Sequence, residues 1–264
     1  MLSDWVGLVW IVGTIFASFA AVGIGILMAE MFGRQYAVLW VVGIQGAFQI
    51  FISFTSAQFV SLVLGGVTFI TIAGSLVYPT LELGQNYLSE FYGFEISRTS
   101  VHAQMLCRIM TSILLLFLFL LPFPSHFEQS HSAFLSLNKI VPRIAVASII
   151  ATWITGLVMV YVYDAVRNLT GDRKMWLRAV SANVVSMAVN SVLFVIMAFA
   201  GVVSASVLVN MILIQILFKF IDSFFELGFL YGLRSLKGRG ILGRSADPVL
   251  PVALSTSAPT GQPS

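Results

Sequence analysis

Polar and charged side chains recur at helical spacing inside otherwise apolar stretches of this sequence. Residues three, four or seven positions apart share one face of a helix. The groups with this spacing are Glu82, Asn86 and Glu90; Lys219, Asp222 and Glu226; and Asn183 and Asn190. Carboxylates accept hydrogen bonds, ammonium groups donate them, and amides do both. The pattern therefore predicts a buried site that recognises a small polar molecule.

Glu82 is the most informative of these residues. It follows Pro79 and has no basic residue within one helical turn, so its partner must come from another helix or from a ligand. Lys219 and Asp222 have two interpretations of equal weight: an internal ion pair, or direct contact with a substrate. Proton coupling of transport is possible through Glu82 or through the Asp222 and Glu226 pair, and facilitated diffusion followed by trapping inside the cell is equally compatible.

The other polar residues in apolar stretches have structural interpretations beside the functional one. Arg108 and Arg143 both lie in such stretches, but Arg143 is close enough to the end of its stretch to reach the interface. It can therefore anchor a helix or bind substrate. Asn183 and Asn190 can bind substrate or join helices by hydrogen bonds. Glu90 we interpret as a solvated helix end.

Enzyme signatures are absent from the sequence. There is no HExxH, GxSxG or P-loop pattern, His102 stands alone, and Cys107 is the single cysteine. The sequence therefore predicts a protein that is not an enzyme and has no metal site and no cofactor. Without a nucleotide-hydrolysing element, any transport must be secondary or driven by a partner.

The composition indicates an integral membrane protein. Of 264 residues, 58% are hydrophobic and 9% are charged, against about 45–50% and about 25% in soluble domains. A membrane-spanning helix needs about 20 apolar residues, and the sequence predicts an all-α bundle of seven such spans. They cover residues 5–29, 36–64, 68–89, 101–121, 140–164, 178–200 and 205–232.

The third predicted span is unusual. It contains Gly74 and Pro79, and proline removes a backbone donor, so we expect a break near Pro79. Irregular backbone within a membrane is tolerated only against protein or a water-filled cavity, which predicts one wall of the site here. Three nearby aromatic side chains are candidates to stack on a flat ring: Tyr78, Tyr87 and Phe91.

Ten of the 14 Lys and Arg residues gather at alternate connections and after the last span, and this asymmetry predicts the orientation. By the positive-inside rule, the C-terminus is cytoplasmic and the protein is a multi-pass protein of the inner (plasma) membrane. We divide the chain into an additional N-terminal helix (1–35), a transporter core (36–236) and a disordered cytoplasmic tail (237–264).

Several motifs occur in register over about Val38 to Leu236. They are YPTLELGQNYLSEFYG at 78–93, PRIAVAS at 142–148, the Ser-rich stretch from Trp176 to Phe199, Lys219, and Tyr231 with Gly232. In this order and spacing they resemble the vitamin uptake transporter family. The resemblance implies a six-helix core and uptake of a queuosine precursor, a 7-deazaguanine used in tRNA modification, such as 7-cyano-7-deazaguanine or queuine.

The sequence departs from that family pattern at three aspartate positions, where it has Asn86, Met159 and Asn190. Acidic residues stand nearby instead, so the resemblance implies a rewired site. A 7-deazaguanine presents adjacent N–H donors beside a carbonyl acceptor, which amides, carboxylates and basic groups can bind. The expected substrate-binding residues are Glu82, Asn86, Arg143, Asn190 and Lys219.

The predicted function is uptake of a small heterocycle by alternating access, with the lipid bilayer and the substrate as partners and no nucleic acid. Two alternatives stay open: a substrate-binding membrane module that needs a separate energising complex, and a structural membrane subunit. The oligomeric state also stays open, a homo-oligomer included.

Overall fold

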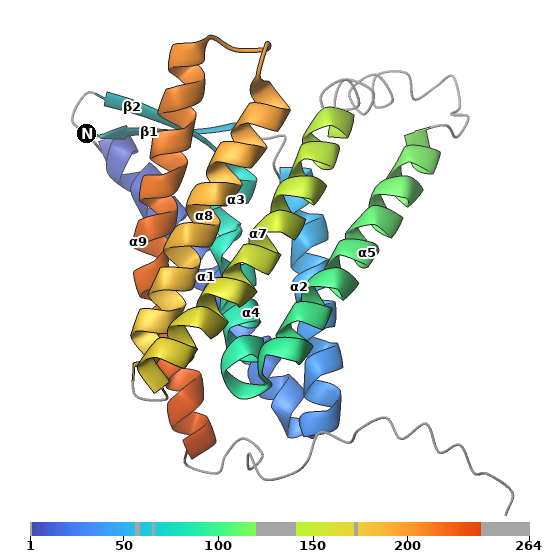
Figure 1. The fold of residues 1–264 in the computed structure, drawn as a ribbon. Helices are drawn as coiled ribbons and strands as arrows, with labels where there is room; N and C mark the ends of the chain where they lie inside the picture. Colours follow the sequence, from blue (N-terminus) through green and yellow to red (C-terminus); the bar gives the residue numbers. More distant parts are fainter. Residues whose placement is uncertain (1, 56–58, 65–66, 120–140, 172–173, 239–264) are drawn as a thin grey trace, which may run out of the picture.

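The computed structural model describes residues 2–55, 59–64, 67–119, 141–171 and 174–238. Seven helices of 13 residues or more form most of this part of the chain (Figure 1). They are α1 (Leu2–Met31), α2 (Arg34–Thr55), α4 (Pro79–Phe91), α5 (Phe94–Phe119), α7 (Val141–Thr170), α8 (Met175–Phe199) and α9 (Ala205–Gly238). The expected disordered tail lies outside the described residues, apart from the end of α9.

Four of the described helices are long and apolar enough to cross a membrane: the α1 segment Val9–Met31 and the segments Arg143–Thr170, Met175–Phe199 and Ala205–Gly238. The apolar part of α2, Tyr36–Ile52, is shorter. The prediction of a polytopic helical membrane protein is therefore confirmed. Of the seven spans that the sequence predicts, four correspond to helices of sufficient length and hydropathy.

A β-hairpin replaces part of the second and third predicted spans. Strand β1 (Phe59–Leu64) pairs antiparallel with β2 (Val67–Ile72), with Leu64 opposite Val67. The prediction of helical spans over 36–64 and 68–89 is therefore wrong for the residues of these two strands, while the other elements of the described chain are helices. β-Branched residues are frequent in these strands, and Gly65 and Gly66 stand between them in the sequence, which favours a hairpin.

The expected interruption beside Pro79 is present, but it is slight. A short helix, α3 (Ala73–Val77), precedes α4, and Tyr78 lies between them with α-helical φ of −52° and ψ of −41°. Proline has no N–H to donate, so the helical hydrogen-bond pattern is interrupted without the chain leaving the helix. The fully non-helical backbone lies earlier, in the hairpin.

The helix α4 lies inside the bundle and contacts α1, α2, α5, α7, α8 and α9 (Figure 1). Every residue from Pro79 to Ser89 is buried. A helix buried on all sides must satisfy its polar groups from its neighbours, because no water reaches them. The many polar residues of α4 are therefore what connects it to the surrounding helices.

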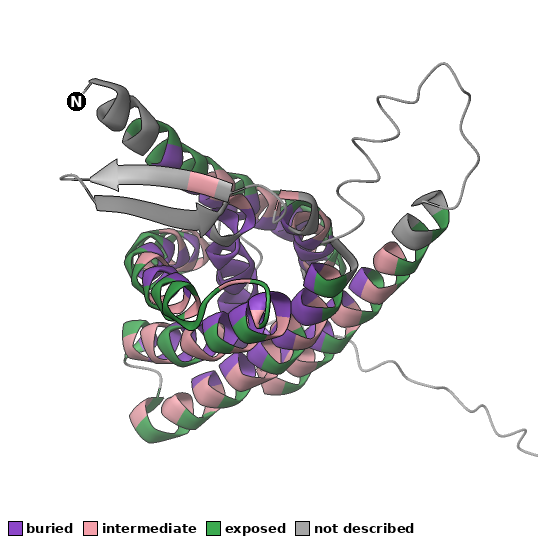
Figure 2. Cartoon of the chain, turned by 90° about the horizontal axis from the view of Figure 1, so that it is seen from above, coloured by how far each residue is buried: buried purple, intermediate pink, exposed green. Residues whose placement is uncertain are grey.

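Apolar side chains also cover the outside of the bundle. Trp10, Leu39, Leu114 and Leu213 are exposed, whereas buried residues line the inner faces of the helices (Figure 2). The buried apolar core includes Phe19 of α1, beside polar groups gathered from most of the helices. This arrangement suits a lipid environment. Lipid tails are as apolar as the exposed side chains, so the helices are held together by packing and by hydrogen bonds between buried polar groups.

Candidate functional site

A cluster of polar side chains joins α4, α7, α8 and α9 in the bundle interior. All of its members are buried. We call it the central polar cluster: Tyr78, Glu82, Asn86, Thr155, Asn183, Ser186, Asn190, Ser191, Lys219, Asp222 and Glu226. Four of the five predicted substrate-binding residues and both predicted coupling residues belong to it.

Glu226 of α9 is held by two amides. Asn86 Nδ2 donates to Glu226 Oε1 at 2.6 Å and to Asn183 Oδ1 at 2.8 Å. Asn183 Nδ2 donates to Glu226 Oε2. Each oxygen of this carboxylate therefore accepts a hydrogen bond from an amide N–H, which favours the ionised form. The three side chains connect α4, α8 and α9 at one level of the bundle.

Lys219 lies about two turns from Glu226 along α9. Its Nζ donates to Asn190 Oδ1 at 2.8 Å and to Ser191 Oγ at 3.3 Å, and it lies 4.7 Å from the centre of the Tyr78 ring. Asn190 Nδ2 in turn donates to the Tyr78 hydroxyl at 3.2 Å and to Thr155 Oγ1 at 3.3 Å. Lys219 is thus held by acceptors on α8 and by an aromatic face.

Lys219 and Asp222 do not form the ion pair that the sequence suggested as one interpretation. Among the described residues, ion pairs within 4.0 Å join other side chains. The Lys219 contacts run toward α8, while Asp222 Oδ2 is buried and accepts no hydrogen bond within the described chain.

Three acceptor oxygens of the central polar cluster have no hydrogen-bond partner in the described part of the chain: Glu82 Oε2, Asn86 Oδ1 and Asp222 Oδ2. The other Glu82 oxygen, Oε1, is reached only by Ser186 Oγ at 3.5 Å. A buried polar atom without a partner costs free energy. Such atoms are candidates to meet a donor that arrives with a ligand.

Arg143 lies elsewhere. It is exposed near the start of α7, where its Nε donates to Met197 O at 2.9 Å and its Nη2 to Ala200 O at 2.6 Å. These carbonyls belong to the end of α8. Arg143 therefore donates hydrogen bonds to carbonyl groups at a helix C-terminus, where intrahelical donors are lacking. The structure does not bring it into the central polar cluster with the other predicted residues.

Glu90 is not the solvated helix end that the sequence suggested; that interpretation is wrong. Its side chain is 9% exposed and accepts hydrogen bonds from Arg178 Nη2 at 2.8 and 2.9 Å and from the Tyr163 hydroxyl at 2.5 Å. Arg234 Nη1 lies 4.0 Å away. An acid at a helix end is buried here because α7, α8 and α9 converge on it.

A second acid, Glu30 of α1, has a similar arrangement at the same end of the bundle. Its Oε1 accepts hydrogen bonds from the Tyr87 hydroxyl, from the Tyr92 hydroxyl at 2.8 Å and from Lys237 Nζ at 3.2 Å. Sequence reasoning missed this residue. The available signal was one carboxylate near the end of an apolar stretch, which required a partner from another helix.

A group of buried glutamines links α2, α4 and α5, and sequence reasoning missed it too. Gln104 Nε2 donates to Gln45 Oε1 at 2.7 Å, Gln49 Nε2 donates to Gln104 Oε1 at 2.8 Å, and Gln85 Nε2 donates to Ser97 Oγ at 2.6 Å. Glutamines four residues apart on α2 were the sequence signal. Their geometry is that of a structural connection between helices.

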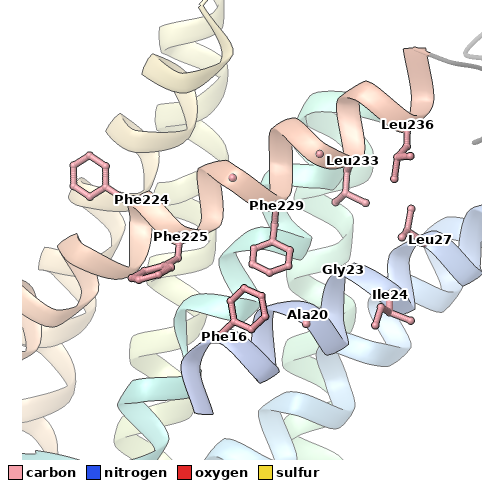
Figure 3. Close-up of a pocket in the computed structure, with 12 residues that line it drawn as sticks. Phe16, Ala20, Gly23, Ile24, Leu27, Phe224, Phe225, Phe229, Leu233 and Leu236 are labelled. Atoms are coloured by element: carbon pink, nitrogen blue, oxygen red, sulfur yellow. The ribbon is translucent and has the colours of Figure 1, made fainter. Parts of the chain in front are cut away.

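An apolar pocket of about 550 Å³ lies between α1 and α9 (Figure 3). Phe16 and Phe229 face one another across it, with ring centres 5.6 Å apart. Its lining contains no side chain that hydrogen-bonds, so it does not suit a polar heterocycle. The described residues also contain no group of three His, Cys, Asp or Glu that could hold a metal ion.

The fold and the cluster together define a multi-pass membrane protein with a cluster of polar side chains buried inside a helix bundle. The family model described as "Putative vitamin uptake transporter" matches residues 72–233, more than half of the chain. The chain therefore belongs to this family of membrane transporters. The match extends from the end of β2 into α9 and contains every member of the central polar cluster.

A curated relative in Bacillus subtilis (strain 168) is 27% identical over 164 residues, which cover 62% of this chain and 71% of the relative. That protein is named "Probable queuosine precursor transporter". No solved structure matches this chain.

Proposed function

We propose that this protein imports a small, flat, nitrogen-rich heterocycle of the 7-deazaguanine type, a queuosine precursor, and binds it at the central polar cluster. The observation that carries the proposal is the set of unpartnered acceptors in that cluster, Glu82 Oε2, Asn86 Oδ1 and Asp222 Oδ2. They come from two facing helices, α4 and α9. The name of the Bacillus relative agrees with this class of substrate.

The chemistry of the ligand complements these acceptors. The guanine-like edge of a 7-deazaguanine carries adjacent N–H donors, which a carboxylate and an amide oxygen accept in parallel. Its carbonyl oxygen accepts from an ammonium group, and Lys219 is the buried cation of the cluster. Tyr78 presents an aromatic face beside Lys219, and such faces pack on flat rings.

Alternating access requires one end of the bundle to close while the other opens. The Glu30 and Glu90 groups join α1, α4, α7, α8 and α9 at the end where α4 finishes. With the C-terminus of α9 in the cytoplasm, as the positive residues predict, these ion pairs close the cytoplasmic end. The proposed transport cycle opens them.

The proposal is tested in a bacterial host that lacks both queuosine-precursor synthesis and its own transporter. The chain is expressed, queuine or 7-cyano-7-deazaguanine is fed at low concentration, and queuosine in tRNA is measured. We expect modification to be restored by the wild-type chain. A membrane-inserted wild-type protein that restores no queuosine with either compound would overturn the proposal.

A matched pair of substitutions links transport to the site. Asn86→Ala removes an amide of the central polar cluster, whereas Asn168→Ala removes an exposed one on α7 that contacts Asp164. We expect queuosine formation to fall at least tenfold for Asn86→Ala and to be unchanged for Asn168→Ala, at equal protein levels. Equal activity of the two variants would place the substrate elsewhere.

A further inference from the structure

The charges of the central polar cluster do not balance. Its charged members are the acids Glu82, Asp222 and Glu226 and one base, Lys219. With every group in its usual ionisation state, the cluster carries two more negative charges than positive ones. Uncompensated charge inside a membrane protein costs several kcal/mol, and a carboxyl group avoids this cost by binding a proton.

No other charged group of the surrounding helices corrects the balance around Glu82. From α8, the neutral Ser186 reaches Glu82 Oε1 at 3.5 Å. Arg108 of α5 is bonded to Thr152 and Ser148 of α7.

In the described part of the chain, α1 and α2 add no cation beside Glu82, so Lys219 of α9 remains the cation of this cluster. Glu30 of α1 is bonded to Lys237 at the end of the bundle. The helix α2 brings the neutral Gln45, which donates to Leu81 O. The hydroxyl of Tyr78, which precedes α4, accepts from Asn190. The group that balances the charge must therefore be a proton or a ligand.

The hydrogen bonds distinguish Glu82 from Glu226. Asp222, whose Oδ2 also has no donor among the described residues, differs from Glu82 in lying one helical turn from the cation Lys219. Both oxygens of Glu226 accept from amide N–H groups, which stabilises its carboxylate. Glu82 has only the 3.5 Å contact from Ser186, and its Oε2 has no donor among the described residues. Glu82 is 3% exposed and lies in the helix that the other helices surround. Its environment stabilises the neutral acid.

We propose that Glu82 is the proton-binding residue of this transporter, neutral in this substrate-free conformation with its cytoplasmic end closed, and that its protonation couples substrate uptake to proton movement. An O–H bond forms on a Glu82 oxygen with a proton from the outer solution and breaks when that proton passes to cytoplasmic water. The protonated acid keeps its carbonyl oxygen able to accept from a substrate N–H, so that proton and substrate are carried together. This inference rests on the proposed transport function.

The first experiment needs no substrate and therefore tests the proton site independently of transport. Infrared spectra of the purified full chain in lipid vesicles are recorded in H2O and in D2O. At neutral pH we expect a carbonyl band of a protonated carboxylic acid, which shifts in D2O and is missing from Glu82→Gln. The band should persist in Glu226→Gln and in Glu95→Gln, a matched control because Glu95 is exposed on α5.

Three infrared results would overturn the assignment: no such band in the wild-type chain, an unchanged band in Glu82→Gln, or loss of the band in Glu226→Gln alone. Glu82→Asp provides a second variant should Glu82→Gln not fold. It keeps a titratable group with a shorter side chain, and we expect it to move the band without removing it.

The second experiment measures coupling with queuine as the probe. In vesicles that contain the wild-type protein, we expect an inward proton gradient to raise queuine accumulation at least fivefold over the level reached without a gradient. Glu82→Gln cannot bind a proton and is expected to bind substrate more weakly, and the ratio of its accumulation with and without the gradient should fall to about one, whereas Glu95→Gln should respond to the gradient as the wild type does. Two results would overturn the proposed coupling: wild-type transport that does not depend on the gradient, or a gradient effect that remains in Glu82→Gln. Absent exchange in the wild type overturns the proposed function instead.

Discussion

Arg178 of α8 donates two hydrogen bonds to the carboxylate of Glu90 of α4, at 2.8 and 2.9 Å, and the Arg178 side chain is fully buried. The same guanidinium donates through Nη1 to Gly171 O at 2.6 Å, at the connection between α7 and α8. One side chain therefore holds α4 to the connection that precedes its own helix. Removing its counter-charge leaves a buried cation uncompensated.

Glu90→Gln should consequently lower the free energy of unfolding by about 3–5 kcal/mol, the usual cost of breaking a buried pair from one side. The measurement is unfolding of the purified protein in detergent, followed by circular dichroism. Glu95→Gln removes an exposed acid that pairs with Arg98 on α5, and it should cost less than about 1 kcal/mol. Equal effects of the two variants would contradict a structural role for the Arg178 pair.

Lys237 and Glu30 should depend on each other energetically. Lys237 Nζ lies 3.2 Å from Glu30 Oε1 and 4.6 Å from the centre of the Phe91 ring, and the Glu30 side chain is fully buried. We expect Lys237→Met to destabilise the protein by roughly 3 kcal/mol and to cost much less in a Glu30→Gln background, with a coupling energy of about 1–3 kcal/mol. A double-mutant cycle measures this, and additive effects would exclude the pair.

Gly84 marks the closest approach of α4 to α2. A Cβ atom there would lie 2.7 Å from Gln45 Nε2 and 2.8 Å from Gln45 Cδ. Gly84→Ala should therefore displace Gln45 from Leu81 O and from Gln104, at a cost of about 1–3 kcal/mol. Gly43→Ala on α2, with no atom within 4 Å of the new Cβ, should be neutral or stabilising. Thermal unfolding of the two variants compares them directly.

A substitution of Arg143 distinguishes a structural role of this residue from a role in substrate binding. Because it satisfies carbonyls at the end of α8 and stands apart from the central polar cluster, Arg143→Gln should leave queuosine formation within about twofold of wild type. Its effect on stability should stay below about 1 kcal/mol, as for other charges at helix C-termini. Loss of uptake at normal protein levels would instead place Arg143 on the substrate path.

Much of the helical architecture follows from apolar stretch length, and most of the cluster follows from helical spacing. Asn86, Asn183 and Glu226 were each placed on the interior face of a helix, and the structure joins them directly. Residues on separate helices meet only through packing, so their pairing could not be read from spacing. The same limit explains why Arg143 was grouped with a site from which the structure separates it.

The errors have identifiable physical causes. The strands of the hairpin are as apolar as a membrane helix, so hydropathy did not distinguish them, although their β-branched residues and the Gly65-Gly66 pair did carry the signal. Glu90 was judged by its position near a helix end. Its burial depends on Tyr163 and Arg178, which are far away in the sequence.

The hairpin also provides a measure of depth in the bilayer. Within the described chain, β1 pairs only with β2, so each strand has an outer edge, and lipid-exposed sheet edges do not occur in hydrocarbon. The hairpin lies near the beginning of α1, at the end of the bundle opposite the end of α9 (Figure 1). β1 also packs against α1 and β2 against α9, and we expect the hydrocarbon layer to begin about where β2 gives way to α3.

From that boundary, α3 (5 residues), Tyr78 and α4 (13 residues) rise through about 28 Å at 1.5 Å per residue. This length is close to the roughly 30 Å thickness of the hydrocarbon layer. Glu82 lies halfway along it, about 14 Å from either surface. A proton or substrate held there has the same distance left to travel in both directions.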